Sequence, residues 1–212
     1  MSHILQRAAC VSCAERMKPV KMVAELRLIH RAMMLVPNTH DVLVVPCGEG
    51  CVMLDLAQRG YAVTGADISE EMTHVARRAA AALGLTCPVH REDLQKLTFP
   101  DGSFDTVICF RLFHKLPTEL RQVIIGELCR VSRHYVLLSY FSAWSYISLN
   151  RKLRGVVGGH KPDRLATSLK ELKGAFAHCG FELLKDFAQL PFLRTVHLAM
   201  WKRIMPIPMV RW

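Results

Sequence analysis

Two glycines and one aspartate have the spacing of a site for a nucleoside-containing ligand. Gly48 and Gly50 come shortly after an unbroken aliphatic run at residues 42–45. Asp67 stands roughly 20 residues after the glycines, the spacing at which an acidic residue can accept hydrogen bonds from the hydroxyls of a ribose. The alternative interpretation is a glycine turn between two core strands, with Asp67 capping the helix that follows.

A β-α-β unit is needed to position these residues, and residues 42–72 have its pattern. The unit opens with β-branched and aliphatic residues only, as in a strand buried on both faces of a parallel sheet. A helix is predicted over residues 51–59, with Gly60 where helices favour glycine as they end. The next strand, residues 61–66, brings Asp67 to the carboxyl end of the sheet, where ligands of open α/β sheets bind.

Charge points to an anionic partner. The chain has 212 residues and a formal net charge of +10, with 51% hydrophobic residues. Such a charge favours contact with nucleic acid, an acidic membrane surface, or a phosphorylated or carboxylated substrate. No arginine-rich tract or aromatic RNA-binding signature supports nucleic acid, which is therefore the weaker of these partners.

The cysteines indicate a reducing compartment rather than a metal site. Eight cysteines are scattered through predicted strands and helices, and Cys10-x-x-Cys13 has no second pair, so no metal site is predicted. No signal-peptide pattern opens the chain, and no window has the ~20 apolar residues of a membrane span. We expect reduced thiols and a cytoplasmic location, with peripheral attachment to the inner membrane face as an option that the charge supports.

Two blocks resemble the class I S-adenosylmethionine-dependent methyltransferases. Residues 42–50, VLVVPCGEG, are similar to the first motif of that family, often written V-L-D-x-G-x-G-x-G. Residues 92–117 look like the second half of the same core, and LFHKLP at 112–117 resembles the L-x-H-x-L-P of ubiquinone-type and small-molecule methyltransferases. A nicotinamide fingerprint, by contrast, would need a small residue at position 53, which is Met53.

The resemblance implies the class I methyltransferase fold. This is an α/β fold with a three-layer, Rossmann-like sheet of seven strands, mostly parallel with an antiparallel seventh strand. The last two predicted strands, residues 181–187 and 195–202, are joined by a short connection and must therefore be antiparallel. That hairpin favours the methyltransferase topology independently of the glycines.

The resemblance also implies S-adenosyl-L-methionine as the cofactor. Gly48, Gly50 and their neighbours would hold the methionine end, Asp67 the ribose, and Asp93 the exocyclic amine of adenine, whose ring Leu94 would cover. The full set of predicted cofactor-binding residues is Pro46, Cys47, Gly48, Glu49, Gly50, Asp67, Ile68, Met72, Asp93, Leu94, Phe110 and Arg111. Arg111 could bind a carboxylate, either that of the methionine moiety or that of an acidic substrate, or could point to solvent.

Three functions follow as hypotheses. The first is methyl transfer to a small-molecule or lipid-like acceptor, which the charge suggests is anionic. The second is a ligand-binding or regulatory module that has lost turnover, because Val44 replaces the acidic residue of the family motif and Pro46 replaces its first glycine. The third is a nucleic-acid methyltransferase, which only the net charge supports. The oligomeric state is not predicted.

His114 is the candidate catalytic residue. It could take a proton from an oxygen or nitrogen nucleophile, or it could hydrogen-bond the backbone and hold the loop after the fourth strand. The insertion at residues 141–165 has two interpretations. It could form the acceptor pocket or its lid, or it could be a solvated loop that is rich in glycine because it is exposed. Its candidate substrate residues are Trp144, Tyr146, Arg151, Arg154 and His160.

The domain organisation follows from these elements. We expect residues 1–40 to form an N-terminal helical extension, residues 41–204 a methyltransferase-like domain that includes the insertion, and residues 205–212 a C-terminal tail. Within the extension, a helix is predicted over residues 21–35. That helix could cover the cofactor pocket, as in the resembling family, or pack on the sheet.

Overall fold

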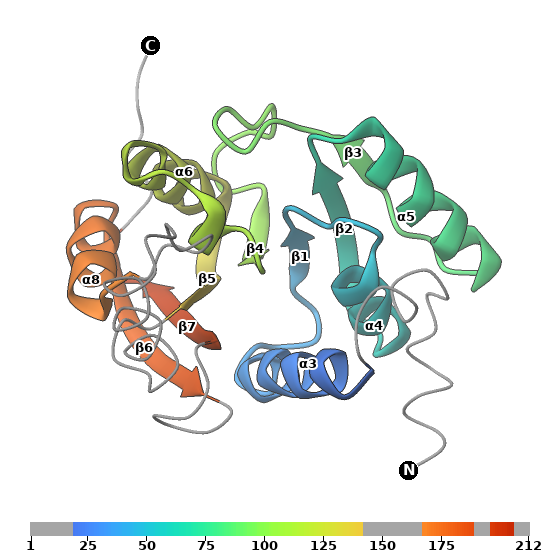
Figure 1. Cartoon of the computed structure of the whole chain (residues 1–212), viewed down its shortest axis with the longest axis horizontal. Helices are drawn as coiled ribbons and strands as arrows, with labels where there is room; N and C mark the ends of the chain where they lie inside the picture. The colour runs from blue at the N-terminus through green and yellow to red at the C-terminus, as the bar shows by residue number, and fades with distance from the viewer. Residues whose placement is uncertain (1–18, 142–166, 189–195, 206–212) are drawn as a thin grey trace, which may run out of the picture.

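A seven-stranded sheet forms the centre of the molecule (Figure 1). The structure is a computed structural model, and it describes residues 19–141, 167–188 and 196–205. The strands are β1 Asp41–Val44, β2 Ala62–Asp67, β3 Val89–Arg91, β4 Phe104–Cys109, β5 Ser132–Phe141, β6 Phe181–Ala188 and β7 Val196–Arg203. They lie in the order β3-β2-β1-β4-β5-β7-β6, with β7 antiparallel to both of its neighbours and the other pairs parallel. The predicted seven-stranded sheet with an antiparallel seventh strand is confirmed.

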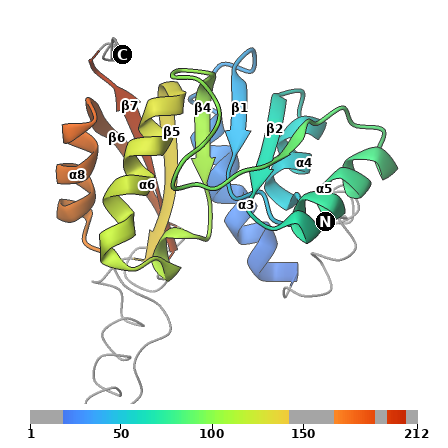
Figure 2. The same ribbon diagram turned by 90° about the horizontal axis from the view of Figure 1, so that it is seen from above.

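Helices cover both faces of the sheet and make three layers (Figures 1 and 2). They are α3 Pro19–Met33, α4 Cys51–Gln58, α5 Glu70–Ala82, the short 3₁₀ helix η1 Phe113–Lys115, α6 Thr118–Val131 and α8 Leu169–His178. Helices α3, α4 and α5 pack with Val42 and Val44 of β1, whereas α6 and α8 belong to the cluster that contains Leu43 and Val45. This alternation is the period of two that a strand imposes on its side chains, and it explains why residues 42–45 are all apolar.

Local signals in the sequence position the helix ends near the strand tips. The Ser69 hydroxyl caps α5 by accepting a hydrogen bond from the Met72 amide at 3.3 Å. Gly60 follows α4 with a φ of 89°, in the left-handed region that favours glycine. Strand β3 begins directly after Pro88, which has no amide to donate and contributes only its carbonyl, the acceptor of a hydrogen bond from the Gly65 amide at 2.8 Å.

The thiols were predicted to be reduced, and this prediction is wrong at one described position. Cys47, Cys87, Cys109, Cys129 and Cys179 are free, whereas Cys51, the first residue of α4, is disulfide-bonded. The spacing of cysteines in the sequence gave no sign of this pairing, because disulfides depend on spatial proximity. As for membrane insertion, none of the helices in the described ranges is long and apolar enough to span a bilayer.

Cys179, at the end of α8, is expected to be the most reactive of the free thiols in the part of the chain that the structure describes. A hydrogen bond from Cys129 and the positive charges of His178 and Arg203 lower the pKa of Cys179 to about 7, although its partial burial acts in the opposite direction. Because the thiolate is the nucleophile, alkylation of Cys179 by iodoacetamide should accelerate as pH rises through about 7 and then level off. Peptide mapping by mass spectrometry of samples labelled between pH 5.5 and 9 measures this.

Cys109 is the internal comparison for that experiment. Burial raises the pKa of Cys109 to about 12, so it should remain unlabelled across the same range. The variant Cys129→Ala removes the hydrogen bond and should move the Cys179 midpoint upward by about one pH unit. A Cys179 midpoint that stays in place in this variant would contradict the assignment.

Candidate functional site

The candidate site is a cavity at the carboxyl ends of the central strands. The chain runs from β1 outward through β2 to β3, and then crosses to β4 on the other side of β1. This reversal separates the loops that follow β1 and β4, which is where open α/β sheets bind ligands. A cavity of about 540 Å³ lies at this point and is large enough for a nucleoside-containing ligand.

Most of the predicted cofactor residues meet in this cavity. Those that line it are Pro46, Cys47, Gly48, Glu49, Asp67, Met72, Phe110 and Arg111, together with the catalytic candidate His114. Gly50 supports the same loop in a left-handed conformation, with a φ of 92°. Residues separated by up to about 70 positions in sequence thus converge because parallel strands end at the same edge of the sheet.

Asp67 links the glycine loop to the start of α5. Its Oδ2 accepts a hydrogen bond from the Gly48 amide at 2.8 Å, and its Oδ1 accepts one from the Ser69 amide at 3.0 Å. The residue is 7% exposed and lies in the cavity wall. A carboxylate has about four acceptor positions, so these two amides leave capacity for ribose hydroxyls. Both interpretations of Asp67 therefore agree with its geometry: it organises the backbone at the helix start, and it faces the cavity.

The close packing of α4 against β2 explains the bulky residue at position 53. Met53 is fully buried and lies over Gly65, where a Cβ atom would be only 2.5 Å from the Met53 Sδ. A glycine on the strand therefore provides the space that a glycine on the helix provides in nicotinamide fingerprints. Met53 thus both rules out a nicotinamide fingerprint and, by packing over Gly65, allows α4 to lie close to β2.

The end of β1 is apolar and carries no charge. Val44 is 1% exposed within the core cluster of α3, α4 and α5, and the peptide bond between Val45 and Pro46 is cis. Cys47 follows, and its amide donates to the Ala66 carbonyl at 2.7 Å. Burial, and secondarily the negative charge of Asp67, raise the pKa of Cys47 to about 12, so the thiol remains protonated at neutral pH and is no nucleophile.

Arg111 lies after β4 in a left-handed backbone conformation, with a φ of 62°. Its amide donates to the Ser139 hydroxyl at 2.6 Å, which ties the end of β4 to β5. Its Nε lies 3.6 Å from Oε2 of Glu25, a buried carboxylate of α3. A positive φ at a residue other than glycine is uncommon and costly, and such strained residues are enriched at functional sites. Of the roles considered for Arg111, the geometry favours one within the cavity.

His114 lies in η1 and is 5% exposed. Its ring centroid is 4.1 Å from that of Phe141, the last residue of β5, and both residues line the cavity. The imidazole therefore packs against the end of β5 in the cavity wall. Both roles considered for it, proton acceptor and support of the loop after β4, are compatible with this place.

Several cavity residues lie outside the set of cofactor residues predicted from the sequence. Met22, Glu25 and Leu26 of α3 line the cavity, while Ile29 and Met33 of the same helix pack in the core. The leading helix therefore does both things that were considered for it. The other unpredicted lining residues include Leu112, Lys115, Ser139, Tyr140, Phe141 and Val196. Ser139, Tyr140, Phe141 and Val196 reach the site through the register of β5 beside β4 and β7, which no local sequence pattern could have identified.

A polar cluster stands at the β5 edge of the cavity. Asp186 Oδ2 accepts hydrogen bonds from the Tyr140 hydroxyl at 3.0 Å and is 2.8 Å from His197 Nδ1. Burial, followed by the negative charge of Asp186, raises the pKa of Tyr140, so the phenol stays protonated and donates. Tyr140 is on β5, Asp186 on β6 and His197 on β7, so these contacts link the three strands to one another.

Some predicted residues lie away from the cavity or outside the described ranges. Ile68 is 60% exposed, Asp93 is exposed, and Leu94 is buried in the core of α6 and α8, and none of the three lines the cavity. Their predicted contacts with the cofactor remain predictions. The substrate candidates Trp144, Tyr146, Arg151, Arg154 and His160 lie outside the residues that the structure describes, as does nearly all of the insertion.

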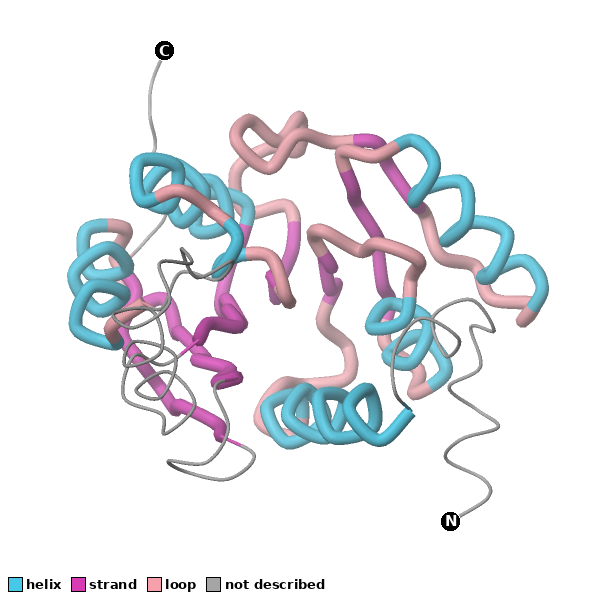
Figure 3. The backbone as a smooth tube through the Cα atoms, viewed as in Figure 1, coloured by secondary structure: helices cyan, strands magenta, loops and turns pink. Residues whose placement is uncertain are grey.

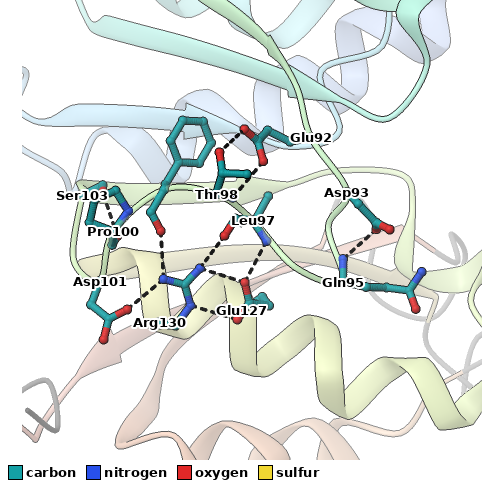
Figure 4. Close-up of polar contacts among 11 residues, drawn as sticks. Glu92, Asp93, Gln95, Leu97, Thr98, Pro100, Asp101, Ser103, Glu127 and Arg130 are labelled. Atoms are coloured by element: carbon teal, nitrogen blue, oxygen red, sulfur yellow. Dashed lines mark hydrogen bonds and ion pairs between the residues drawn. The ribbon is translucent and has the colours of Figure 1, made fainter. Parts of the chain in front are cut away.

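The segment that carries Asp93 is held by an arginine on the neighbouring helix. Residues 92–103 join β3 to β4 as a loop, without a helix between them (Figure 3). Arg130 of α6 donates to the carbonyls of Leu97 at 2.9 Å and Phe99 at 2.8 Å, and to Asp101 at 2.8 Å (Figure 4). Glu127 accepts from Arg130 through both oxygens and also from the Leu97 amide at 2.9 Å. These contacts fix the loop against α6.

The start of that loop has its own buried acid. Glu92 is 7% exposed and accepts from the Thr98 amide at 2.9 Å and the Thr98 hydroxyl at 2.6 Å (Figure 4). Asp93 Oδ1 accepts from the Gln95 amide at 2.9 Å. The Asp93 carboxylate is thus oriented by its own loop, and Arg130 holds the rest of the loop in place.

Replacing Arg130 with methionine should destabilise the protein. The change leaves two backbone carbonyls and Glu127 without their charged donor, at an expected cost of about 2 kcal/mol in the free energy of unfolding. Urea unfolding followed by circular dichroism measures it. Arg133→Met is the matched control, because Arg133 is 44% exposed and pairs at the surface with Asp105, where the loss should be below about 0.5 kcal/mol. Equal losses in the two variants would contradict the role assigned to Arg130.

Comparisons with known proteins agree with this geometry. A family model described as "Methyltransferase domain" matches residues 42–134. The 2-heptyl-1-hydroxyquinolin-4(1H)-one methyltransferase of Mycobacteroides abscessus is 35% identical over 107 residues, which are 49% of this chain and 47% of that protein. The ubiquinone biosynthesis O-methyltransferase of Coxiella burnetii is 31% identical over 110 residues, or 52% of this chain and 47% of that protein. The chain therefore aligns with about half the length of these relatives.

A solved structure matches over more of the chain. Magnesium protoporphyrin IX methyltransferase from Synechocystis, crystallised with S-adenosylhomocysteine bound, superimposes with a TM-score of 0.72 at 21% identity. The match covers 85% of this chain and 84% of that one. At this identity the likeness establishes the fold, including the order of the strands around the cavity.

Proposed function

We propose that the chain is a class I S-adenosylmethionine-dependent methyltransferase and that it transfers a methyl group from S-adenosylmethionine to a small-molecule acceptor. The observation that carries this proposal is the joint placement of the glycine loop and Asp67 in one cavity wall, at the point where the sheet reverses.

The residues present fit such a cofactor. A ribose would meet the Asp67 carboxylate, which faces the cavity with acceptor capacity to spare. The methionine end would lie over residues 46–50, close to the start of α4, and Asp93 with Leu94 would approach the adenine. The apolar side chains of Met72 and Phe110 would cover the remaining surface. When bound, the cofactor supplies a methyl group made electrophilic by its sulfonium, and so the protein needs mainly to position the two reactants.

The acceptor would be an oxygen or nitrogen nucleophile approaching in line with the carbon–sulfur bond. A bond forms between this nucleophile and the methyl carbon as the carbon–sulfur bond breaks, and the nucleophile loses a proton. We place His114 beside the acceptor to receive that proton, since it is held against Phe141 at the cavity. Proximity supplies most of the rate, so loss of His114 should reduce turnover without abolishing cofactor binding.

The acceptor class is inferred from charge and from relatives. Relatives at 31–36% identity are named for a hydroxyquinolone, ubiquinone biosynthesis, magnesium protoporphyrin and phosphatidylethanolamine. Together with the net charge of +10, this favours a flat or lipid-like acceptor with anionic character, reached in the cytoplasm or at its membrane surface. We assign residues 141–165 to the acceptor side of the domain formed by residues 41–204, with Arg151 and Arg154 as its anion-binding residues.

A second candidate is a module that binds the cofactor without turnover. It is favoured by Val44, which puts a buried apolar side chain where the family motif has an acid. One assay distinguishes the two candidate functions. Protein is incubated with S-adenosylmethionine labelled in its methyl group and with phenol, aromatic N-hydroxy, carboxylate and phospholipid-amine acceptors, and label in the organic extract is counted.

Label in one acceptor class is the result expected. Binding of S-adenosylhomocysteine without transfer to any class would support the module instead. The absence of both binding and transfer would overturn both candidates. Retention on DNA or RNA that falls steeply with salt would favour the nucleic-acid alternative, and we expect a flat profile.

A further inference from the structure

The amino-acid end of S-adenosylmethionine is a zwitterion, and its two charges need partners in the cavity. An ammonium requires carboxylate or carbonyl acceptors, and a carboxylate requires cationic or amide donors, because an unpaired buried charge is costly. Val44, which takes the place of the acid in the family motif, is buried among apolar side chains and provides no charge. A carboxylate partner for the ammonium therefore has to come from another element.

Among the described residues that line the cavity, the carboxylates are Glu25, Glu49 and Asp67. Asp67 is already engaged by two amides at the β2 side, where the ribose is placed. Glu49 lies on the glycine loop itself and is partly exposed. Glu25 is only 3% exposed, which makes it the most enclosed of the three.

Glu25 is carried to the cavity by the apolar stripe of α3. Met22 and Leu26 are buried beside it, and Ile29 continues the stripe into the core, so the helix is anchored with its first turns over the strand ends. Glu25 occupies a position in that stripe where the helical period would otherwise favour an apolar residue. A buried acid at such a position, facing a cavity, indicates a functional group rather than a packing residue.

Arg111 faces Glu25 from the opposite side. The two are 3.6 Å apart at Nε and Oε2, which is an ion-pair distance but longer than a direct hydrogen bond. A guanidinium has five N–H donors in a planar fork, a geometry that suits recognition of a carboxylate. The Arg111 backbone is held in its left-handed conformation by the bond to Ser139, which fixes the starting point of the side chain.

We propose that Glu25 and Arg111 together bind the amino-acid end of the cofactor, with Glu25 accepting from its ammonium and Arg111 donating to its carboxylate. In this arrangement α3 supplies the charge that the first motif lacks at Val44. The inference rests on the proposed function, because it names residues for one end of the cofactor proposed there. It also gives the leading helix a direct part in ligand recognition, in addition to its packing on the sheet.

Two ligands that differ only in this end separate the roles. S-adenosylhomocysteine has the whole amino-acid end, whereas 5′-methylthioadenosine has the adenosine and the sulfur without it. Dissociation constants are measured by titration calorimetry for wild type, Glu25→Gln and Arg111→Gln. Glu49→Gln tests the rival carboxylate, and Glu182→Gln, an exposed position on β6, is the control for the loss of one charge.

Glu25→Gln should weaken S-adenosylhomocysteine by about tenfold or more, and change 5′-methylthioadenosine by less than about twofold. Arg111→Gln should weaken S-adenosylhomocysteine similarly. A third ligand, decarboxylated S-adenosylhomocysteine, keeps the ammonium and lacks the carboxylate. Arg111→Gln should bind this ligand with close to wild-type affinity. The Glu182→Gln control should bind both ligands as wild type does.

Other results overturn the inference. Equal weakening of both ligands by Glu25→Gln would make the pair merely structural, and selective weakening by Glu49→Gln alone would assign the ammonium to Glu49. If Glu25→Gln does not fold, Glu25→Asp keeps the charge on a shorter side chain, and it should still discriminate between the two ligands. Wild-type protein that binds neither ligand removes the proposed function, whereas wild type that binds both with equal affinity removes only this inference.

Discussion

Replacing Asp67 with alanine will lower the affinity for S-adenosylhomocysteine about 100-fold, or about 2.7 kcal/mol. The substitution removes the acceptor for the ribose hydroxyls. It also removes the acceptor of the Gly48 amide and of the Ser69 amide, so the glycine loop loses its tie to β2. Titration calorimetry measures the affinity, and a thermal melt of each variant separates lost binding from lost folding.

Two further variants sharpen that result. Asp67→Asn keeps one acceptor oxygen but no charge, and it should lose about tenfold. Glu71→Ala removes an exposed carboxylate on α5 and should bind as wild type does. Unchanged affinity in a folded Asp67→Ala protein would show that the ribose is not held there.

Trp201→Ala will give the largest loss of stability, about 4 kcal/mol in the free energy of unfolding. Trp201 of β7 is fully buried, and its ring stacks on Phe176 of α8 with centroids 4.1 Å apart and planes 5° from parallel. The truncation leaves a cavity between α8 and the antiparallel end of the sheet. Urea unfolding of both proteins measures the difference.

Trp201→Phe is the matched variant for that experiment. The indole Nε1 is buried and has no hydrogen-bond partner within the described part of the chain, so phenylalanine removes an unsatisfied donor while it keeps most of the stacking. We expect a loss of about 1 kcal/mol. A loss in Trp201→Phe as large as that in Trp201→Ala would contradict the view that stacking and volume dominate at this site.

Much of the fold follows from periodicity alone. Residues 42–45 and 136–138 are apolar without interruption, since their alternate side chains enter different clusters on the two faces of the sheet. Gly60 and Ser69 mark helix ends because glycine tolerates a positive φ and serine can accept from a free amide. The observed strand boundaries differ slightly from the predicted ones, as at β2 and β7, because hydrogen-bond partners decide where a strand ends.

The site could be predicted only where one local motif contains it. Gly48 and Asp67 belong to a single β-α-β unit, and their spacing predicted that both belong to one site; the hydrogen bond between them is a finding of the structure. Glu25 and Ser139 reach the cavity through helix packing and through the register of β5 beside β4, which sequence spacing does not determine. The disulfide state of Cys51 was mispredicted for the same reason, because it depends on which residues meet in space.

Val44 and Pro46, the two residues that differ from the first motif of the family, have different consequences for the cavity. Val44 is compensated in our proposal by Glu25, an acid on another element that faces the same cavity. Pro46 removes one amide from the loop, but the amides of Cys47 and Gly48 still hold the loop to β2 through Ala66 and Asp67. The loop is thus fixed by contacts that the altered motif leaves intact.

The central claim is that the cavity at the ends of β1 and β4 holds S-adenosylmethionine. A crystal structure of the wild-type protein grown with saturating S-adenosylhomocysteine tests it most directly. We predict density for the whole ligand in this cavity, with the ribose hydroxyls on Asp67 and the amino-acid end between Glu25 and Arg111. A cavity that stays empty at saturating ligand, or a ligand bound elsewhere on the protein, would contradict the account.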